Sequence, residues 1–148
     1  MSETRTSDAE NFQWPRSGVG AEELLEKART AAENAYAPYS GFRVGAALMT
    51  SDGSVFSGCN VENASYGMSI CAERNAVGAM IVAGHLDPVV IAVTGGENGE
   101  PCPPCGACRQ VLLEFNPDLR VVLESPEKIL ILRVDLLLPL TFSLMKKN

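Results

Sequence analysis

The chain lacks long apolar stretches and concentrations of basic residues. None of its apolar runs reaches the ~20 residues that cross a bilayer, and the first thirty positions do not show the basic-then-apolar order of a signal peptide. The twelve Lys and Arg residues are scattered, and the formal net charge is -6. Nucleic-acid binding requires clustered basic side chains. We therefore expect a cytoplasmic protein that binds neither membranes nor nucleic acid.

Histidine is also scarce, whereas cysteine is not. The single histidine, His85, lies in a polar stretch and is expected at the surface. The five cysteines are an odd number in a chain without secretion signals, and three of them stand at metal-ligand spacing. Metal binding is therefore favoured over a disulfide framework.

The chain has the length of one domain, 148 residues. Residues 1–20 are polar and are predicted to form a mobile arm. Phe12 and Trp14 could anchor this arm on the body, but exposure of both is favoured. Residues 21–148 are predicted to form a single domain.

Helical and extended patterns alternate along this domain. The first helix is expected to stop at Pro38, and Asp52-Gly53 predicts a hairpin turn. Because helices and strands alternate in the second half, neighbouring strands there are expected to be parallel. The prediction is a three-layer α/β/α sandwich around a mixed five-stranded sheet. Its expected helices are 21–37, 71–83 and 106–115, and its expected strands are 43–50, 54–58, 88–94, 119–123 and 129–134, followed by a turn at 135–138.

Two short segments carry the candidate chemistry, Cys71-Ala72-Glu73-Arg74 and Pro104-Cys105-Gly106-Ala107-Cys108. Together they supply three thiolates and one carboxylate. Cys105 and Cys108 are three apart at the start of an expected helix, so both sulfurs project from one side of its first turn. Three protein ligands leave the fourth position of a zinc ion open to water, whereas a structural site normally closes with four.

A Cys, a Glu that is not a ligand, and then Pro-Cys-x-x-Cys is the pattern of zinc-dependent nucleobase deaminases. We therefore predict a zinc hydrolase that removes an amino group, with Glu73 transferring the protons. Arg74 is expected to hydrogen-bond the Cys71 thiolate and to offset the negative charge of three thiolates on a divalent ion. Arg109 and Gln110 have a weaker claim to this role.

Cys102 leaves an alternative ligand pair open, because residues 101–105 also read Pro-Cys-x-x-Cys. The two prolines between Cys102 and Cys105 forbid a helical first turn, so Cys105 with Cys108 is preferred. Cys59 closes an expected strand and is predicted to be a small buried residue.

Over residues 21–142 the chain resembles the small homotetrameric cytidine deaminases. Besides the metal motifs, three segments carry the resemblance: Tyr36-Ala37-Pro38-Tyr39-Ser40-Gly41-Phe42, Val44-Gly45-Ala46-Ala47, and Gly58-Cys59-Asn60-Val61-Glu62-Asn63-Ala64-Ser65-Tyr66-Gly67. The resemblance implies hydrolysis of cytidine and deoxycytidine to uridine and deoxyuridine, with release of ammonia, in pyrimidine salvage. It also implies one zinc per chain held by Cys71, Cys105 and Cys108, with Glu73 catalytic and Arg74 neutralising a thiolate.

The same resemblance assigns contacts to the nucleoside. Asn60 and Glu62 match the pair that binds the ribose 3′-hydroxyl, and Phe42 is similar to the aromatic residue that packs beside the nucleoside. Ala72 would offer backbone contacts to the pyrimidine, while Glu73 would also hold N3 and the amino group.

Tyr66 and Phe142 match residues that reach into a neighbouring subunit's site, which implies a homotetramer with shared active sites. The family usually continues Leu-Leu-Pro-x-x-Phe with Gly-Pro, but here Ser143-Leu144 follows Phe142. The strand at 129–134 is also more apolar than the family pattern.

The sequence supports three other functions less well. A deaminase of a modified aminopyrimidine nucleoside, as in the blasticidin deaminases, is the nearest alternative, but Asn60-Val61-Glu62-Asn63 favours plain cytidine. A polynucleotide-editing deaminase is disfavoured by the acidic charge. A non-catalytic zinc-binding scaffold is disfavoured by the intact Glu73.

Overall fold

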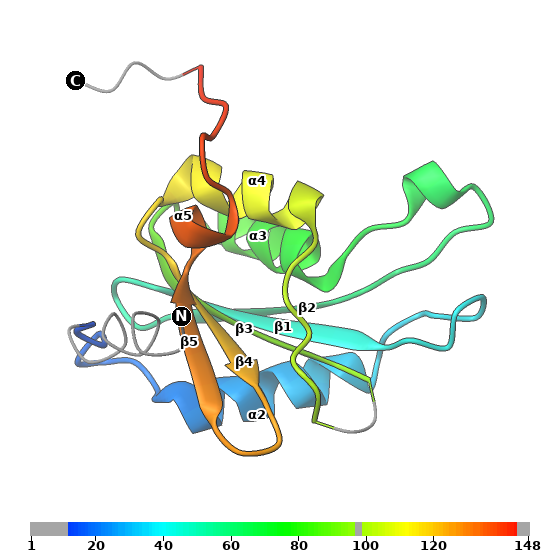
Figure 1. Ribbon diagram of the computed structural model, residues 1–148, viewed down its shortest axis with the longest axis horizontal. Helices are drawn as coiled ribbons and strands as arrows, with labels where there is room; N and C mark the ends of the chain where they lie inside the picture. The colour runs from blue at the N-terminus through cyan, green and yellow to red at the C-terminus, as the bar shows by residue number, and fades with distance from the viewer. Residues whose placement is uncertain (1–11, 97–98, 145–148) are drawn as a thin grey trace.

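The computed structural model describes residues 12–96 and 99–144. These residues form one mixed sheet in the order β2-β1-β3-β4-β5, with helices on both faces (Figure 1). The predicted three-layer sandwich around five strands is confirmed for this part of the chain. No helix there is long and apolar enough to cross a membrane. The elements are α2 (Ala21–Ala32), β1 (Val44–Thr50), β2 (Val55–Cys59), the 3-10 helix η1 (Tyr66–Met68), α3 (Ala72–Val82), β3 (Pro88–Gly95), α4 (Gly106–Phe115), β4 (Arg120–Glu124), β5 (Ile129–Arg133) and α5 (Val134–Leu137).

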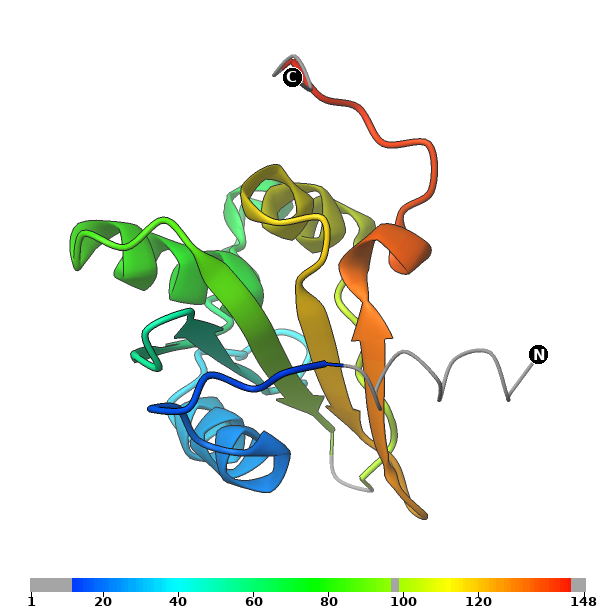
Figure 2. The same ribbon diagram turned by 90° about the vertical axis from the view of Figure 1, so that its left-hand side faces the viewer.

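The sheet separates two apolar layers. Helix α2 covers one face, while α3 and α4 lie on the other (Figures 1 and 2). Successive β1 side chains point to opposite faces. Ala46 and Leu48 therefore pack into the cluster that contains α3 and α4 residues, whereas Ala47 and Met49 pack into the cluster that contains α2 residues.

Strand direction follows the length of each connection. β3 and β4 are joined through α4 and run parallel, as predicted for the second half of the domain. β4 and β5 run antiparallel instead. Only residues 125–128 connect them, and a parallel pair needs a crossover of a dozen residues or more.

Two local predictions were wrong. Helix α2 ends at Ala32 rather than at 37, six residues before Pro38. The Tyr36 N–H donates to Asn60 O at 3.0 Å and the Glu62 N–H donates to Tyr36 O at 2.8 Å, so pairing with the segment after β2 replaces further helix. The expected turn at 135–138 is instead mostly occupied by α5.

From residues 12–20 of the predicted arm, Phe12, Trp14 and Val19 pack against the cluster that contains α2 residues, and residues 1–11 lie outside the described residues. Phe12 and Trp14 are half-buried with ring centroids 5.3 Å apart, and Arg120 lies over the Phe12 ring. The expectation that these two aromatics are exposed was wrong. His85 is also half-buried, with its ring 5.1 Å from that of Phe56.

Two glycines let the helices approach the sheet closely. A Cβ atom at Gly45 would lie 1.8 Å from Ala28 O, and one at Gly58 would lie 2.4 Å from Ala72 O. Gly58 thus allows the first turn of α3 to rest on β2. Asn75 secures this contact by donating from Nδ2 to Cys59 O at 2.8 Å. The close contact fixes where the first turn of α3 lies relative to β2.

Candidate metal centre and active site

Three cysteine sulfurs meet where α3 and α4 begin. Cys71 is the N-cap residue of α3, and Cys105 is the N-cap residue of α4. Cys105 Sγ lies 3.8 Å from Cys71 Sγ and 3.5 Å from Cys108 Sγ, and all three sulfurs lie within 4.8 Å of one another. Zinc–sulfur bonds of about 2.3 Å in tetrahedral geometry place two sulfurs about 3.8 Å apart. The group therefore has the donor type and spacing that zinc requires.

The three thiols differ in their electrostatic surroundings. Burial raises the pKa of Cys71 and of Cys108. Burial also acts to raise the pKa of Cys105, but hydrogen bonds from the backbone N–H groups of Cys108 and Ala107 help to lower it overall. These N–H groups belong to the first turn of α4, where a helix has no internal acceptors for them. A divalent ion deprotonates thiols that coordinate it, including the two that burial keeps protonated.

Glu73 lies in the first turn of α3 with 4% of its surface exposed. Burial raises the pKa of its carboxyl, against smaller lowering contributions from its own backbone N–H, Cys108 and the charge of Arg74. A carboxyl group with a raised pKa can both accept and return a proton near neutral pH. Ala72, directly before it, is fully buried.

Arg74 contacts the three-sulfur group. Its Nη2 lies 4.0 Å from Cys71 Sγ and donates to Ser69 O at 3.2 Å. Its Nε is buried and has no hydrogen-bond partner among the described residues. The guanidinium therefore places positive charge beside the Cys71 sulfur.

Arg109 and Gln110 make different contacts from those considered for them. Arg109 donates to Pro104 O and Leu137 O, both at 2.7 Å. Gln110 donates from Nε2 to Phe142 O at 3.2 Å. Both residues therefore bind backbone carbonyls around α4.

Cys102 does not join the three-sulfur group. A Cβ atom at Gly95 would lie 2.8 Å from Cys102 Sγ and 3.1 Å from the Phe42 ring, so the thiol lies at the end of β3. Burial, helped by the charges of Glu73 and Cys71, raises the pKa of Cys102 to about 11. The structure thus groups Cys71 with the Cys105 and Cys108 pair. Cys59 is half-buried and also lies outside the group.

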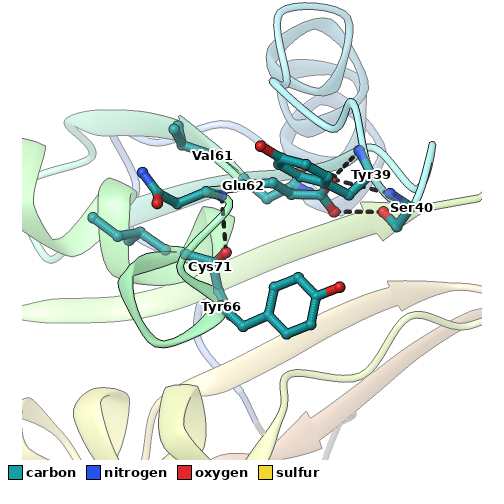
Figure 3. Close-up of a pocket in the computed structure, with 10 residues that line it drawn as sticks. Tyr39, Ser40, Val61, Glu62, Tyr66 and Cys71 are labelled. Atoms are coloured by element: carbon teal, nitrogen blue, oxygen red, sulfur yellow. Dashed lines mark hydrogen bonds between the residues drawn. The ribbon is translucent and has the colours of Figure 1, made fainter.

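A cavity of about 400 Å³ opens beside Cys71 (Figure 3). The Glu62 carboxylate lies in its wall and accepts hydrogen bonds from the Ser40 hydroxyl at 2.5 Å, Ser40 N–H at 3.1 Å and Tyr39 N–H at 2.9 Å. These bonds hold the pKa of Glu62 below its usual range, and the bond from the Ser40 hydroxyl makes the largest contribution. The lining residues are Tyr39, Ser40, Asn60, Val61, Glu62, Asn63, Tyr66, Ser69, Ile70 and Cys71.

Asn60 and Phe42 are held by the backbone around them. Asn60 Oδ1 accepts from Val44 N–H at 2.8 Å, and its Nδ2 donates to Phe42 O at 2.9 Å. The Phe42 ring packs against Gly95 and Gly96 and lines a second cavity of about 500 Å³. Asn60 therefore joins the start of β1 to the segment that carries Phe42.

Tyr39 and Ser40 are site residues that sequence reasoning did not single out. Both lie in the first of the segments that carry the resemblance, but nothing in their residue types indicates that Glu62 binds them. Tyr66 lines the cavity of its own chain and is 82% exposed. Phe142 is 69% exposed and lies on the segment that leads away from the body after α5 (Figures 1 and 2).

Residues 20–124 match the family model of the cytidine and deoxycytidylate deaminase zinc-binding region. The chain belongs to this family. The cytidine deaminase of Halalkalibacterium halodurans is 52% identical over 101 residues, which are 68% of this chain and 76% of that protein. Two crystal structures of family members are also similar. That of the Burkholderia pseudomallei cytidine deaminase is 49% identical with a TM-score of 0.78, over 84% of this chain and 100% of that one.

The second is the Mycobacterium tuberculosis cytidine deaminase, which is 42% identical with a TM-score of 0.75, over 85% of this chain and 99% of that one. These relatives confirm the predicted family, fold and enzyme class.

Proposed function

We propose that this family member hydrolyses cytidine and deoxycytidine to uridine and deoxyuridine, releasing ammonia, and serves pyrimidine salvage in the cytoplasm. The observation that carries the proposal is the meeting of three sulfurs at zinc spacing with the buried carboxyl of Glu73 close by in the first turn of α3. Relatives about half identical to the chain, named cytidine deaminases, support the substrate. A reducing compartment keeps the three thiols free to bind metal.

Cys71, Cys105 and Cys108 would hold one zinc per chain. Bound zinc supplies a water nucleophile at neutral pH. Three thiolates on a divalent ion leave a net negative charge, which works against this activation. Arg74, through its contact with Cys71, and the N-termini of α3 and α4 offset part of that charge.

Glu73 transfers the protons of the reaction. It accepts one proton from the attacking water and passes it to N3 of the pyrimidine as C4 becomes tetrahedral. It then accepts the proton of the new C4 hydroxyl and passes it to the departing amine. Cytidine and water thus become uridine and ammonia, with no redox partner. Burial of the carboxyl keeps bulk water from competing for these protons.

The nucleoside binds between the metal ligands and the cavity walls. Asn60 and Glu62 hold the ribose 3′-hydroxyl, and each has hydrogen-bonding capacity beyond the contacts it makes to Phe42, Val44 and Ser40. The backbone of Ala72 contacts the pyrimidine. The Phe42 ring, which packs against Gly95 and Gly96, lies beside the nucleoside.

An assay of ammonia release tests the function. Purified protein supplied with cytidine should release one ammonia for each uridine formed. A non-catalytic scaffold would bind zinc and release none. A deaminase of a modified nucleoside would act faster on that nucleoside than on cytidine, and this result would contradict the proposed substrate.

Four chains assemble into a homotetramer with shared sites. Support comes from large apolar side chains that a single chain leaves exposed. Val82, at the end of α3, is 90% exposed, and Leu86, just after it, is 67% exposed. Tyr66 and Phe142 are exposed as well. Light scattering should give about 60 kDa, four times the 15.8 kDa chain. A fully active monomer would contradict shared sites.

Phe142→Ala should weaken substrate binding by about 1–3 kcal/mol, because the ring would be lost from a closed pocket of the neighbouring subunit. Steady-state kinetics should show this as a raised KM. Leu144→Ala is the matched control, because it removes another exposed apolar side chain from the same segment. Unchanged KM and kcat in Phe142→Ala would contradict the role of this residue.

A further inference from the structure

Arg109 joins two segments that are far apart in the sequence. It follows Cys108 directly in α4 and donates from Nε to Pro104 O and from Nη1 to Leu137 O, each at 2.7 Å. Both distances lie at the short end for N–H···O bonds. The side chain is half-buried. One guanidinium therefore holds one carbonyl before α4 and another at the end of α5.

The carbonyl of Pro104 belongs to the turn that delivers the first sulfur of the Cys105 and Cys108 pair. Pro104 is buried and directly precedes Cys105. Pro103 and Pro104 have no backbone N–H, so the turn cannot be held by hydrogen bonds that they donate. A side chain that binds the Pro104 carbonyl fixes the peptide plane from which Cys105 begins.

The carbonyl of Leu137 belongs to the last residue of α5 (Val134–Leu137). Carbonyls at a helix C-terminus have no partner within the helix, and a cationic side chain satisfies them well. Beyond this point the chain leads away from the body (Figure 1). Gln110, the next residue of α4, binds the carbonyl of Phe142 in the departing segment.

We propose that Arg109 is a positioning residue that anchors both the Cys105 turn and the C-terminal segment 138–144. Its guanidinium links the turn before the metal ligand Cys105 to the start of the segment that carries Phe142, and Gln110 adds a second bond to that segment. The inference rests on the proposed function, since that function assigns the metal to Cys105 and the shared-site role to Phe142.

Arg109→Ala tests the anchor in the zinc-loaded, full-length protein. Release of zinc to an excess of the chelator 4-(2-pyridylazo)resorcinol should be about 10–100-fold faster than in the unsubstituted protein, the range by which losing a residue that orients a ligand weakens metal affinity. Amide hydrogen exchange should become faster in residues 138–144. The exchange rates in β1 and β3 should stay unchanged. Arg120→Ala is the matched control.

Like Arg109, Arg120 is half-buried and donates to a backbone carbonyl, that of Asp118. It differs in position, because it pairs with Val90, near the end of β3 that is opposite to Gly95. Its loss should change zinc release less than twofold. A general loss of stability would speed exchange in every element, so the local pattern separates positioning from a merely structural role.

Arg109→Lys decides the matter should Arg109→Ala fail to fold. An ammonium group keeps the charge but cannot reproduce the planar two-pronged geometry, so both zinc release and exchange in 138–144 should still rise. Zinc release at the original rate in the folded variant, or unchanged exchange in the segment, would overturn the proposal. Neither readout uses a substrate, so failure of the cytidine assay would leave this result separate.

Discussion

Glu73→Gln should retain the fold and the zinc but lose activity by about a hundredfold or more, because the amide cannot accept the proton from water or return it to the amine. Burial already disfavours the charged form of this carboxyl, so a neutral isostere is tolerated in the first turn of α3. Circular dichroism, elemental analysis and the rate of ammonia release measure the three properties.

Glu23→Gln is the matched control for this substitution. Glu23 also lies in the first turn of a helix, α2, but it is exposed and on the other face of the sheet. If Glu73 served only to match the helix dipole, the two variants would behave alike. Near-normal turnover by Glu73→Gln would refute the proton-transfer role.

Cys108→Ser should reduce bound zinc from about one per chain to nearly none, because a hydroxyl is a poor replacement for one of only three thiolates. Cys108 is fully buried in the first turn of α4, so no neighbouring thiol can take its place without moving the helix. Elemental analysis after dialysis gives the zinc content, and ammonia release should fall with it.

Cys102→Ser, in the loop before α4, is the control, and it should retain zinc. Its sulfur lies against the end of β3, outside the three-sulfur group. Loss of zinc from Cys102→Ser as complete as from Cys108→Ser would show that the wrong pair has been assigned. Active protein without any metal would contradict the whole donor set.

Local patterns predicted the elements that carry the site. The helix 106–115 was placed correctly from its apolar spacing and from Gly106, which follows the proline-rich loop. Cys105 and Cys108 could be paired from sequence because both sulfurs lie within one helical turn, a distance that the backbone alone determines. The end of α2 could not be predicted, because Tyr36 leaves the helix to bond with Asn60 and Glu62, which are distant in sequence.

The sequence by itself determined the donor types, the carboxyl between them and the family. The motifs around Cys71 and Cys105 contain this information in residue order alone. Only the tertiary structure decided that Cys71 meets this pair and that Cys102 does not. Cys71 reaches Cys105 because α3 and α4 pack on the same face of the sheet, where Gly58 lets α3 approach β2. Such distances depend on packing between segments remote in sequence, and no local pattern encodes them.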